Sequence, residues 1–336
     1  MKFLLIFFAL LPAISFSQKY QLVPLPAGPK TSIRGLSIVS DRVAWVSGSN
    51  GYVGKTIDSG TTWQWTQPAG KENLDFRDIQ AFNSQKAIIV NAGSPAYILM
   101  TVDGGKSWKT TYHNADPAIF LDGMDFWNGK QGMIFGDPIA HRMQLLQTTD
   151  GGLSWSNISA NLKLDMAEGE AGFAASGTTI KVVGKGQVWV SSGGMAANIY
   201  HSADYGQNWN RYALPIWSGG NSTGPFSMDF YNELQGMVVG GDYLQDELNT
   251  NNILLTINGG KDWFKPKVPV TGYRSGVKYI NKLLCIAVGT SGVDLSTDGG
   301  QTWSLLSDLS FNAVGASKNG KLVLLAGGNG LLYKLK

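Results

Sequence analysis

Hydrophobic residues along this chain gather in short groups, separated by polar turns rich in glycine. One stretch shows the unit clearly, with such groups at residues 123–127, 132–135, 143–148 and 155–158. Groups of this length, bounded by Gly, Asn and Asp, are typical of β-strands rather than helices. The pattern therefore predicts an all-β protein whose repeating unit has four strands, here named A to D in chain order.

One octapeptide recurs six times, each time between strands C and D, with the pattern Ser/Thr-x-Asp-x-Gly-x-Thr/Ser-Trp. The copies lie at residues 56–63, 101–108, 148–155, 202–209, 256–263 and 296–303. Asn258 replaces the Asp of the fifth copy, and Asn208 and Asp262 replace the later hydroxyl residue. In a turn, Asp accepts hydrogen bonds from nearby amides, Gly supplies positive φ, and Trp packs between sheets. We therefore expect these boxes to be structural rather than catalytic.

The spacing of the boxes predicts the architecture. Successive box tryptophans are 45, 47, 54, 54 and 40 residues apart, which matches one four-stranded propeller blade. After the sixth box, residues 311–316, 322–326 and 331–335 can supply strands A, B and C, and residues 20–25 can supply the missing strand D. We predict a seven-bladed β-propeller of four-stranded antiparallel blades, closed by the N-terminal strand joining the C-terminal blade. Six blades with a disordered terminus is the alternative.

The N-terminus has the features of a secretory signal peptide. Lys2 precedes an apolar run over residues 3–11, and small residues stand at positions 15 and 17. We predict a signal peptide at 1–17 and a single propeller domain at 18–336. No later stretch approaches the roughly 18 apolar residues of a membrane helix. We therefore expect an exported protein, periplasmic or extracellular, with no integral membrane segment after cleavage, and we expect it to be a monomer.

Composition excludes several classes of function. Loss of Lys2 lowers the formal net charge from +3 to +2, which leaves no electrostatic footprint for nucleic acid. A single cysteine, Cys285, lies in an apolar run, so we expect a buried, inert thiol. His113, His141 and His201 are too scattered along the sequence for a metal site. We find no dinucleotide, flavin or phosphate-loop motif, and we expect no cofactor and no metal.

The boxes resemble the Asp box of bacterial neuraminidase repeats. The whole mature chain resembles the Asp-box propellers related to the photosystem II stability and assembly factor family and its exported bacterial relatives. Residues 136–138, 169–176, 240–243 and 273–276 carry the likeness to the bacterial relatives. The photosynthetic members are assembly chaperones, which implies a protein-binding propeller. They are similar in having arginines near strand starts, here Arg34, Arg77 and Arg274. Sialidases share the box, but their Arg-Ile-Pro motif is absent from this sequence.

The candidate site lies on the face without boxes. In a propeller the A–B and C–D connections lie on one face, and the B–C and D–A connections lie on the other. The boxes occupy the first face, and the residues that break the repeat occupy the second, where a rigid scaffold can present functional loops. The candidate residues there are Arg34, Arg77, Asp122, Asp137, Glu170, Asp242, Tyr243, Tyr273 and Arg274.

Two functional hypotheses follow. The first is carbohydrate binding, with hydrolysis possible through paired carboxylates drawn from Glu170, Asp137 and Asp242. The residues expected to hold the sugar are Arg274, Tyr273, Tyr243, Arg77, Arg34 and Asp122. The alternative is a non-enzymatic protein-interaction scaffold that uses the arginines, and a purely structural domain is a third reading.

Purely structural roles are the alternative to these assignments. Asp137 and Asp242 suit turn caps, and Arg34 and Arg77 suit ion pairs between blades, with Asp78 as one partner. We expect Arg274 to be the more exposed arginine, and all three guanidinium groups to face one funnel. The carboxylates Asp122, Asp137, Glu170 and Asp242 should approach the same mouth from other blades.

Overall fold

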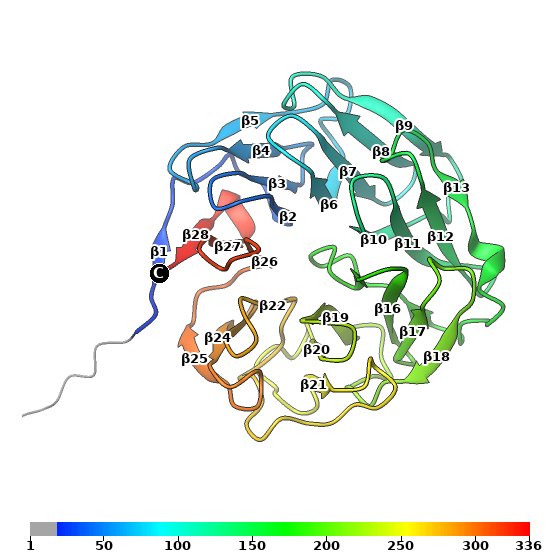
Figure 1. Ribbon diagram of the computed structural model, residues 1–336, viewed down its shortest axis with the longest axis vertical. Coiled ribbons are helices and arrows are strands. Elements are labelled where there is room, and N and C mark those ends of the chain that lie inside the picture. The colour runs from blue at the N-terminus through cyan, green and yellow to red at the C-terminus, as the bar shows by residue number, and fades with distance from the viewer. Residues whose placement is uncertain (1–18) are drawn as a thin grey trace, which may run out of the picture.

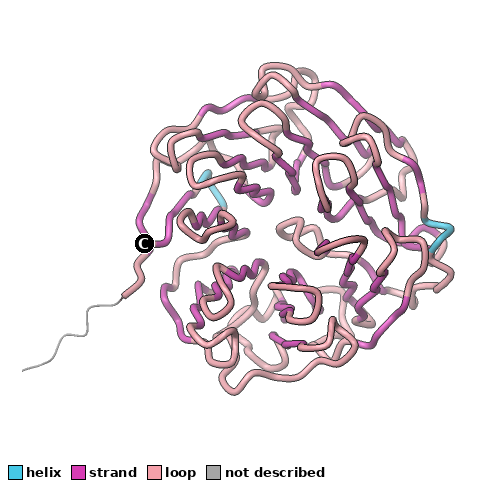
Figure 2. The backbone as a smooth tube through the Cα atoms, in the orientation of Figure 1, coloured by secondary structure: helices cyan, strands magenta, loops and turns pink. Residues whose placement is uncertain are grey.

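The computed structural model describes residues 19–336, and its strands form seven sheets around a central axis (Figure 1). The seven-bladed prediction is confirmed. Strands and loops make up nearly all of the described chain (Figure 2), with 3-10 helices at Ser159–Asn161 and Gly328–Gly330. Within residues 19–336, no helix is both long and apolar enough to cross a membrane. The predicted signal peptide at 1–17 lies outside the described residues.

The first three blades have the predicted four strands each. Blade 1 is β2 (Ile33–Ile38), β3 (Ala44–Gly48), β4 (Val53–Thr56) and β5 (Gln64–Thr66). Blade 2 is β6 (Asp75–Ala81), β7 (Ala87–Ala92), β8 (Ala96–Thr101) and β9 (Lys109–Asn114). Blade 3 is β10 (Leu121–Phe126), β11 (Gly132–Ile139), β12 (Arg142–Thr148) and β13 (Ser156–Asn157).

Blades 4 and 5 depart from the pattern. Blade 4 is β15 (Ile180–Val183), β16 (Gln187–Gly194), β17 (Asn198–Ser202) and β18 (Asn210–Ala213), and β14 (Glu170–Ala171) pairs with the far end of β16. Blade 5 is β19 (Thr223–Phe230), β20 (Gly236–Asp242) and β21 (Ile253–Thr256). Its fourth strand is reduced to a bridge between Leu255 and Phe264.

The last two blades close the ring. Blade 6 is β22 (Gly276–Tyr279), β23 (Cys285–Gly289), β24 (Gly292–Ser296) and β25 (Ser304–Ser307). Blade 7 is β26 (Ala313–Ala316), β27 (Val323–Ala326), β28 (Leu332–Leu335) and, from the other end of the chain, β1 (Leu22–Pro24). Leu22 pairs with Leu335 and Pro24 with Tyr333, and Figure 1 shows β1 alongside β28. The predicted closure is confirmed, and it leaves no open sheet edge between the first and last blades.

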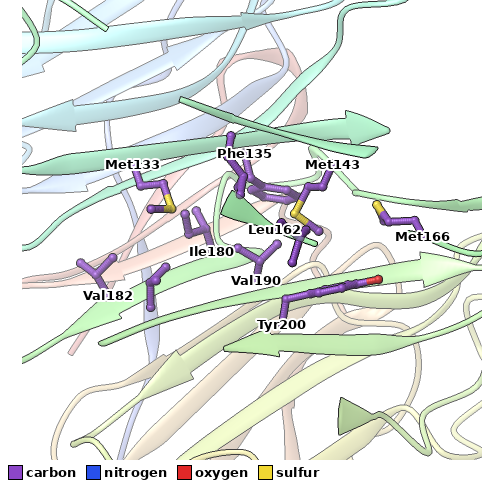
Figure 3. Packing of buried hydrophobic residues seen from close by; sticks show 11 residues of the cluster. Met133, Phe135, Met143, Leu162, Met166, Ile180, Val182, Val190 and Tyr200 are labelled. Carbon is purple, nitrogen blue, oxygen red and sulfur yellow. The ribbon is translucent and has the colours of Figure 1, made fainter. Parts of the chain in front are cut away.

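The core lies between neighbouring blades rather than inside any one of them. Figure 3 shows the contact of blades 3 and 4, where Met133 and Phe135 face Ile180, Val182 and Val190. All of these side chains are buried, and alternate residues of each strand point into the same layer. Burial of apolar area against both neighbours is therefore what holds each blade in the ring.

Each Asp box closes a turn with its own side chains. In blade 1 the Thr56 hydroxyl donates to Asp58 (2.8 Å) and accepts from the Gly60 amide (2.9 Å). Asp58 also accepts from the amide (2.9 Å) and hydroxyl (2.6 Å) of Thr62. The hydrogen bonds from Thr62, above all, lower the pKa of Asp58 to about 2. The Asp is fully engaged within its turn, which fits the structural role expected for the boxes.

Side chains of the innermost strands tie each blade to the next. Asp78 of blade 2 accepts from the Met124 amide of blade 3 (2.6 Å), and Asp229 of blade 5 accepts from the Tyr279 amide of blade 6 (2.9 Å). Burial raises the pKa of Asp78 well above its usual range. These contacts satisfy strand amides that face the central channel rather than a neighbouring strand. The tie residues differ in type between blades, with Ser37 in blade 1 and Asp125 in blade 3.

Candidate functional site

Several inner strands carry one extra residue near their first end, on the face without boxes. The register of β2 with β3 shifts around Arg34, that of β6 with β7 around Arg77, and that of β10 with β11 around Asp122. The pairing of β19 with β20 shifts in the same way around Phe226. A β-bulge turns the extra side chain away from the sheet, and all four of these side chains line one cavity at the mouth of the central channel.

This cavity has a volume of about 420 Å³ and mixed chemistry. We call it the mouth cavity. Its main side chains are two arginines, two carboxyl groups and five aromatic rings: Arg34, Arg77, Asp122, Asp137, Phe120, Phe173, Phe226, Tyr243 and Tyr273. Six of the nine residues predicted from the sequence therefore meet here.

The segment at residues 172–179, here called the plug loop, forms the floor. It joins β14 to β15 and reaches into the centre of the ring (Figures 1 and 2). Ala175 lines the mouth cavity, whereas Ser176 and Thr178 line the channel beyond it. The Ser176 hydroxyl donates to the Ser275 carbonyl of blade 6 (2.7 Å), and the Phe173 ring stacks on Phe226 of blade 5 at 4.0 Å. The plug loop thus separates the mouth from the rest of the channel.

The two arginines of the cavity have different partners. The Arg77 Nε atom lies 2.7 Å from Asp75 in an ion pair. The Arg34 Nη1 atom donates to the Ala175 carbonyl of the plug loop (3.0 Å), and Arg34 forms no ion pair within the described chain. Burial and repulsion from Arg77 lower the pKa of Arg34. The suggested pairing with Asp78 is wrong, because that carboxylate is occupied by strand amides.

The two carboxyl groups of the cavity lie at neighbouring bulges of blade 3. The side chain of Asp122 is 1% exposed, and neither of its oxygens has a hydrogen-bond partner among residues 19–336. Asp137 accepts from the Gly172 amide of the plug loop (2.8 Å), so it secures the next blade rather than capping its own turn. Burial, and then the neighbouring charge of Asp137, raise the pKa of Asp122 well above its usual range, and burial also raises the pKa of Asp137.

Glu170 lies outside the mouth cavity, in a buried polar network. Its carboxylate accepts from the Ala167 amide (2.8 Å), Asn198 Nδ2 (2.8 Å) and the Tyr200 hydroxyl (2.9 Å), and also from the Ser192 hydroxyl. It borders a second depression of about 400 Å³ that shares Asp137 and Phe173 with the mouth cavity. This network fixes β14 against β16 and β17, and a catalytic role for Glu170 stays a prediction.

Asp242 also lies outside the mouth cavity. It is 4% exposed and accepts from the Leu244 amide (2.9 Å) and Gln245 Nε2 (3.2 Å). This is the turn-capping role predicted from the sequence as the structural alternative for Asp242. The expectation that all four candidate carboxylates approach one mouth is therefore wrong for Glu170 and Asp242.

The expectation that Arg274 is exposed and faces the funnel is wrong. Its side chain is fully buried, and Nε donates to Asp294 at 2.8 Å. The remaining donors reach the Thr271 hydroxyl (2.7 Å) and the Ser291 hydroxyl (2.8 Å). The guanidinium is thus fully hydrogen-bonded inside blade 6. It attaches the loop that precedes β22 to strand β24.

The aromatic wall contains Phe226, which was not among the residues predicted from the sequence. Phe226 packs edge-on against Tyr273 (4.8 Å between ring centroids) and Tyr243 (6.0 Å). Tyr273 is buried and Tyr243 is 46% exposed, so the wall continues to the surface. A signal was present, because Phe226 precedes Ser-Met-Asp-Phe just as Asp122 precedes Gly-Met-Asp-Phe. Aligning the strand starts would have placed both at the bulge.

No group of three or more His, Cys, Asp or Glu side chains within residues 19–336 is arranged to hold a metal ion.

The fold and the mouth cavity define an Asp-box β-propeller with a mixed-charge pocket on the face without boxes. A model of the family described as photosynthesis system II assembly factor YCF48 matches residues 14–116 and 92–209, and a BNR/Asp-box repeat model matches residues 295–305. The chain belongs to the YCF48 family.

Solved structures share the fold at low identity. The structure titled "YCF48 bound to D1 peptide" is 16% identical, with 95% of this chain and 97% of that chain covered and a TM-score of 0.67. YCF48 from Cyanidioschyzon merolae is 16% identical, with 94% and 98% covered and a TM-score of 0.65. The GH74 xyloglucanase from Xanthomonas campestris is 14% identical, with 94% and 53% covered and a TM-score of 0.62, so this chain spans about half of that enzyme. A search of curated protein sequences gave no match.

Proposed function

We propose that this protein is an exported, non-enzymatic propeller that binds a segment of a protein partner in the mouth cavity. The observation that carries the proposal is the pair of arginines at adjacent bulges, Arg34 and Arg77. They face one cavity, and among residues 19–336 only Arg77 of the two has a carboxylate partner. Two close guanidinium groups repel each other, and an anionic ligand relieves that repulsion.

The shape of the site supports a peptide side chain or chain end as the ligand. A cavity of about 420 Å³ with a closed floor and an aromatic wall suits one or two side chains rather than a long polymer. Tyr243 extends the wall to the surface, where a bound segment can continue. The structural neighbour titled as bound to a D1 peptide supports protein binding by a propeller of this family.

A glycan is the second candidate, favoured by a different observation. Asp122 and Asp137 lie beside the aromatic rings of Tyr243 and Tyr273, and sugars combine ring stacking with hydrogen bonds to carboxyl groups. Hydrolysis through Glu170 and Asp242 is less favoured, because their oxygens already serve the fold. The GH74 neighbour carries the same fold and adds no chemistry to this choice.

A selection from a random-peptide library on the purified chain tests the proposal. Binding of a selected peptide should weaken by about tenfold or more in Arg34→Ala, because an ion pair in a partly buried cavity is lost. Arg42→Ala is the matched control, since Arg42 belongs to the same blade but lies exposed on the A–B hairpin of the opposite face.

Titration calorimetry of both variants distinguishes the outcomes. Loss of affinity in Arg34→Ala alone supports the mouth cavity as the binding site. Equal affinity in all three proteins would place the peptide elsewhere and contradict the proposal. Enrichment of no peptide, together with saturable binding of an oligosaccharide that Tyr243→Ala removes, would favour the glycan.

A further inference from the structure

Blade 3 places two carboxyl groups, those of Asp122 and Asp137, at the mouth cavity. Leu121 of β10 pairs with Gly136 of β11, and the bulged residues Asp122 and Asp137 follow directly after each of them. Burial, and then the nearby charge of Asp137, raise the pKa of Asp122, so the two acidic side chains lie close together, and both line the mouth cavity. Like charges at neighbouring positions destabilise a sheet unless something neutralises them.

Asp122 is the unusual member of the pair. It is 1% exposed, and neither carboxyl oxygen has a hydrogen-bond partner among the described residues. A buried polar group without a partner costs free energy, and native structures rarely keep one without a reason. Asp137 is less buried and uses one oxygen for the Gly172 amide, so its other oxygen is available to the cavity.

Burial and the charge of Asp137 raise the pKa of Asp122 more than Arg77 lowers it, so nearby charged groups neutralise the pair only in part. Arg77 of β6 is paired with Asp75, and Arg34 of β2 donates to the plug loop. Glu170 of β14, which borders the adjoining depression, is itself acidic and hydrogen-bonded. A metal ion is not the natural occupant either, because no cluster of three ligating side chains exists within residues 19–336.

We propose that Asp137, with Asp122 behind it, receives a basic side chain of the bound segment, the guanidinium of an arginine or the ammonium of a lysine. The proposal rests on the proposed function and deepens it, because it names a second charge on the ligand. Arg34 then takes an anionic group and Asp137 a cationic group, both within one cavity of about 420 Å³.

The surroundings of Asp137 suit such a group. Asp137 and Phe173 border both the mouth cavity and the adjoining depression of about 400 Å³, so a long side chain can cross between them. The Phe173 ring can pack against a guanidinium while the carboxylate accepts its hydrogen bonds. Arginine fits this combination of a planar carboxylate and a ring better than lysine does.

The pair also predicts a proton signature. Burial raises the pKa of both carboxyl groups, and a cationic ligand beside them lowers it, so binding of such a ligand should release protons at a pH where the pair titrates. A group that is protonated in the free protein and ionised in the complex makes binding stronger as pH rises. The proton goes to the buffer, and binding in buffers of different ionisation enthalpy should report release of about one proton.

Three small probes separate the two charges. N-acetyl-arginine carries a carboxylate and a guanidinium, N-acetyl-citrulline carries the carboxylate with a neutral isostere, and N-acetyl-argininamide carries the guanidinium alone. Calorimetry should show N-acetyl-arginine binding about tenfold more tightly than N-acetyl-citrulline. Asp137→Asn should remove that preference and the proton release while leaving N-acetyl-citrulline unchanged. Weakening of all three probes alike would mean a structural role for Asp137 and contradict the proposal.

Two further variants keep the tests independent. Asp122→Asn keeps the Asp137 carboxyl group, so the guanidinium preference should persist with less proton release. Arg34→Ala should weaken the two carboxylate-bearing probes equally and leave N-acetyl-argininamide unchanged. Binding of N-acetyl-citrulline through Arg34 with no guanidinium preference would overturn this inference and spare the proposed function. Binding of N-acetyl-argininamide through Asp137, with no effect of Arg34→Ala on any probe, would contradict the proposed role of Arg34 and support the role of Asp137. No heat from any probe at millimolar concentration would contradict both the proposed function and this inference.

Discussion

The two faces of the ring are built from the same strands but treat polar groups in opposite ways. On the face with boxes, Asp58 and its counterparts receive every hydrogen bond from within their own turn. On the face without boxes, Asp122 is buried with no partner, and Arg34 has only a carbonyl of the plug loop. The carboxyl groups of the boxes are satisfied within their own turns, whereas, among the described residues, a buried carboxyl group beside the mouth cavity is not.

The difference shows how one scaffold separates stability from recognition. The boxes fix each C–D turn with local contacts, so that face needs nothing from a ligand. Bulges at the opposite strand ends turn Arg34, Arg77, Asp122 and Phe226 into the mouth cavity without disturbing the blades. Function can change at those positions while the ring stays intact.

The largest expected effect comes from replacing a buried arginine, Arg274, and comparing it with replacement of the cavity arginine, Arg34. Arg274→Ala should lower the free energy of unfolding by about 3–5 kcal/mol, because it leaves Asp294 buried without its cation. Arg34→Ala should cost about 1 kcal/mol or less, because its side chain is partly exposed and has no ion pair. Denaturant unfolding of both variants checks the order, and a larger loss in Arg34→Ala would contradict it.

A smaller effect is expected from adding a side chain at Gly172, where the plug loop packs closely against Asp122. A Cβ atom on Gly172 would collide with the Asp122 carboxyl group, so Gly172→Ala should cost about 1–3 kcal/mol and weaken ligand binding. Gly129→Ala is the control, because no atom lies within 4 Å of the added carbon. Thermal unfolding and calorimetry together measure both effects. Unchanged binding in Gly172→Ala would show that the carboxyl pair does not position the floor of the cavity.

The box face can be tested with an isosteric change. Thr148→Val removes the hydroxyl that donates to Asp150 (2.8 Å) and accepts from the buried Gly152 amide (2.9 Å). The orphaned amide should cost about 1–2 kcal/mol of unfolding free energy, with peptide affinity unchanged. Thr110→Val, on the exposed surface of β9, should have little effect. A loss of ligand affinity in Thr148→Val would show that the two faces are coupled.

The smallest expected effect is a pH dependence of the boxes. Hydrogen bonds from the turn lower the pKa of Asp58 and of Asp150 to about 2. Groups with a lowered pKa in the folded state stabilise it above their unfolded pKa of about 4, and this contribution is lost as pH falls towards 2. Asp58→Asn should flatten that part of the stability curve, because Asn258 already makes the equivalent contacts in the fifth box. An identical acid profile in the variant would show that Asp58 does not contribute.

The sequence predicts the ring well because its evidence is repeated. Six boxes at regular spacing define the blades, and the strand patterns at both ends predict the closure of β1 on β28. The residues at strand starts were also found, because a break in a repeat is visible in the text. Six of the nine predicted site residues line the mouth cavity.

Two of the remaining three depend on contacts between segments that sequence spacing does not relate, whereas Asp242 caps its own turn. Arg274 is buried because Asp294, twenty positions later, lies opposite it in the same blade. Glu170 is buried because Asn198 and Tyr200, both on β17, converge on it. Nothing in the local sequence distinguishes these side chains from Arg34 or Asp137, since partners, rather than residue type, decide exposure.

The most direct test of recognition at the irregular face is hydrogen exchange measured by mass spectrometry with and without a selected peptide. Binding in the mouth cavity should slow exchange of the plug loop at residues 172–179 and leave the box turns, such as residues 56–63, unchanged. Protection confined to the box turns, with the plug loop unaffected, would contradict the assignment of recognition to the face without boxes.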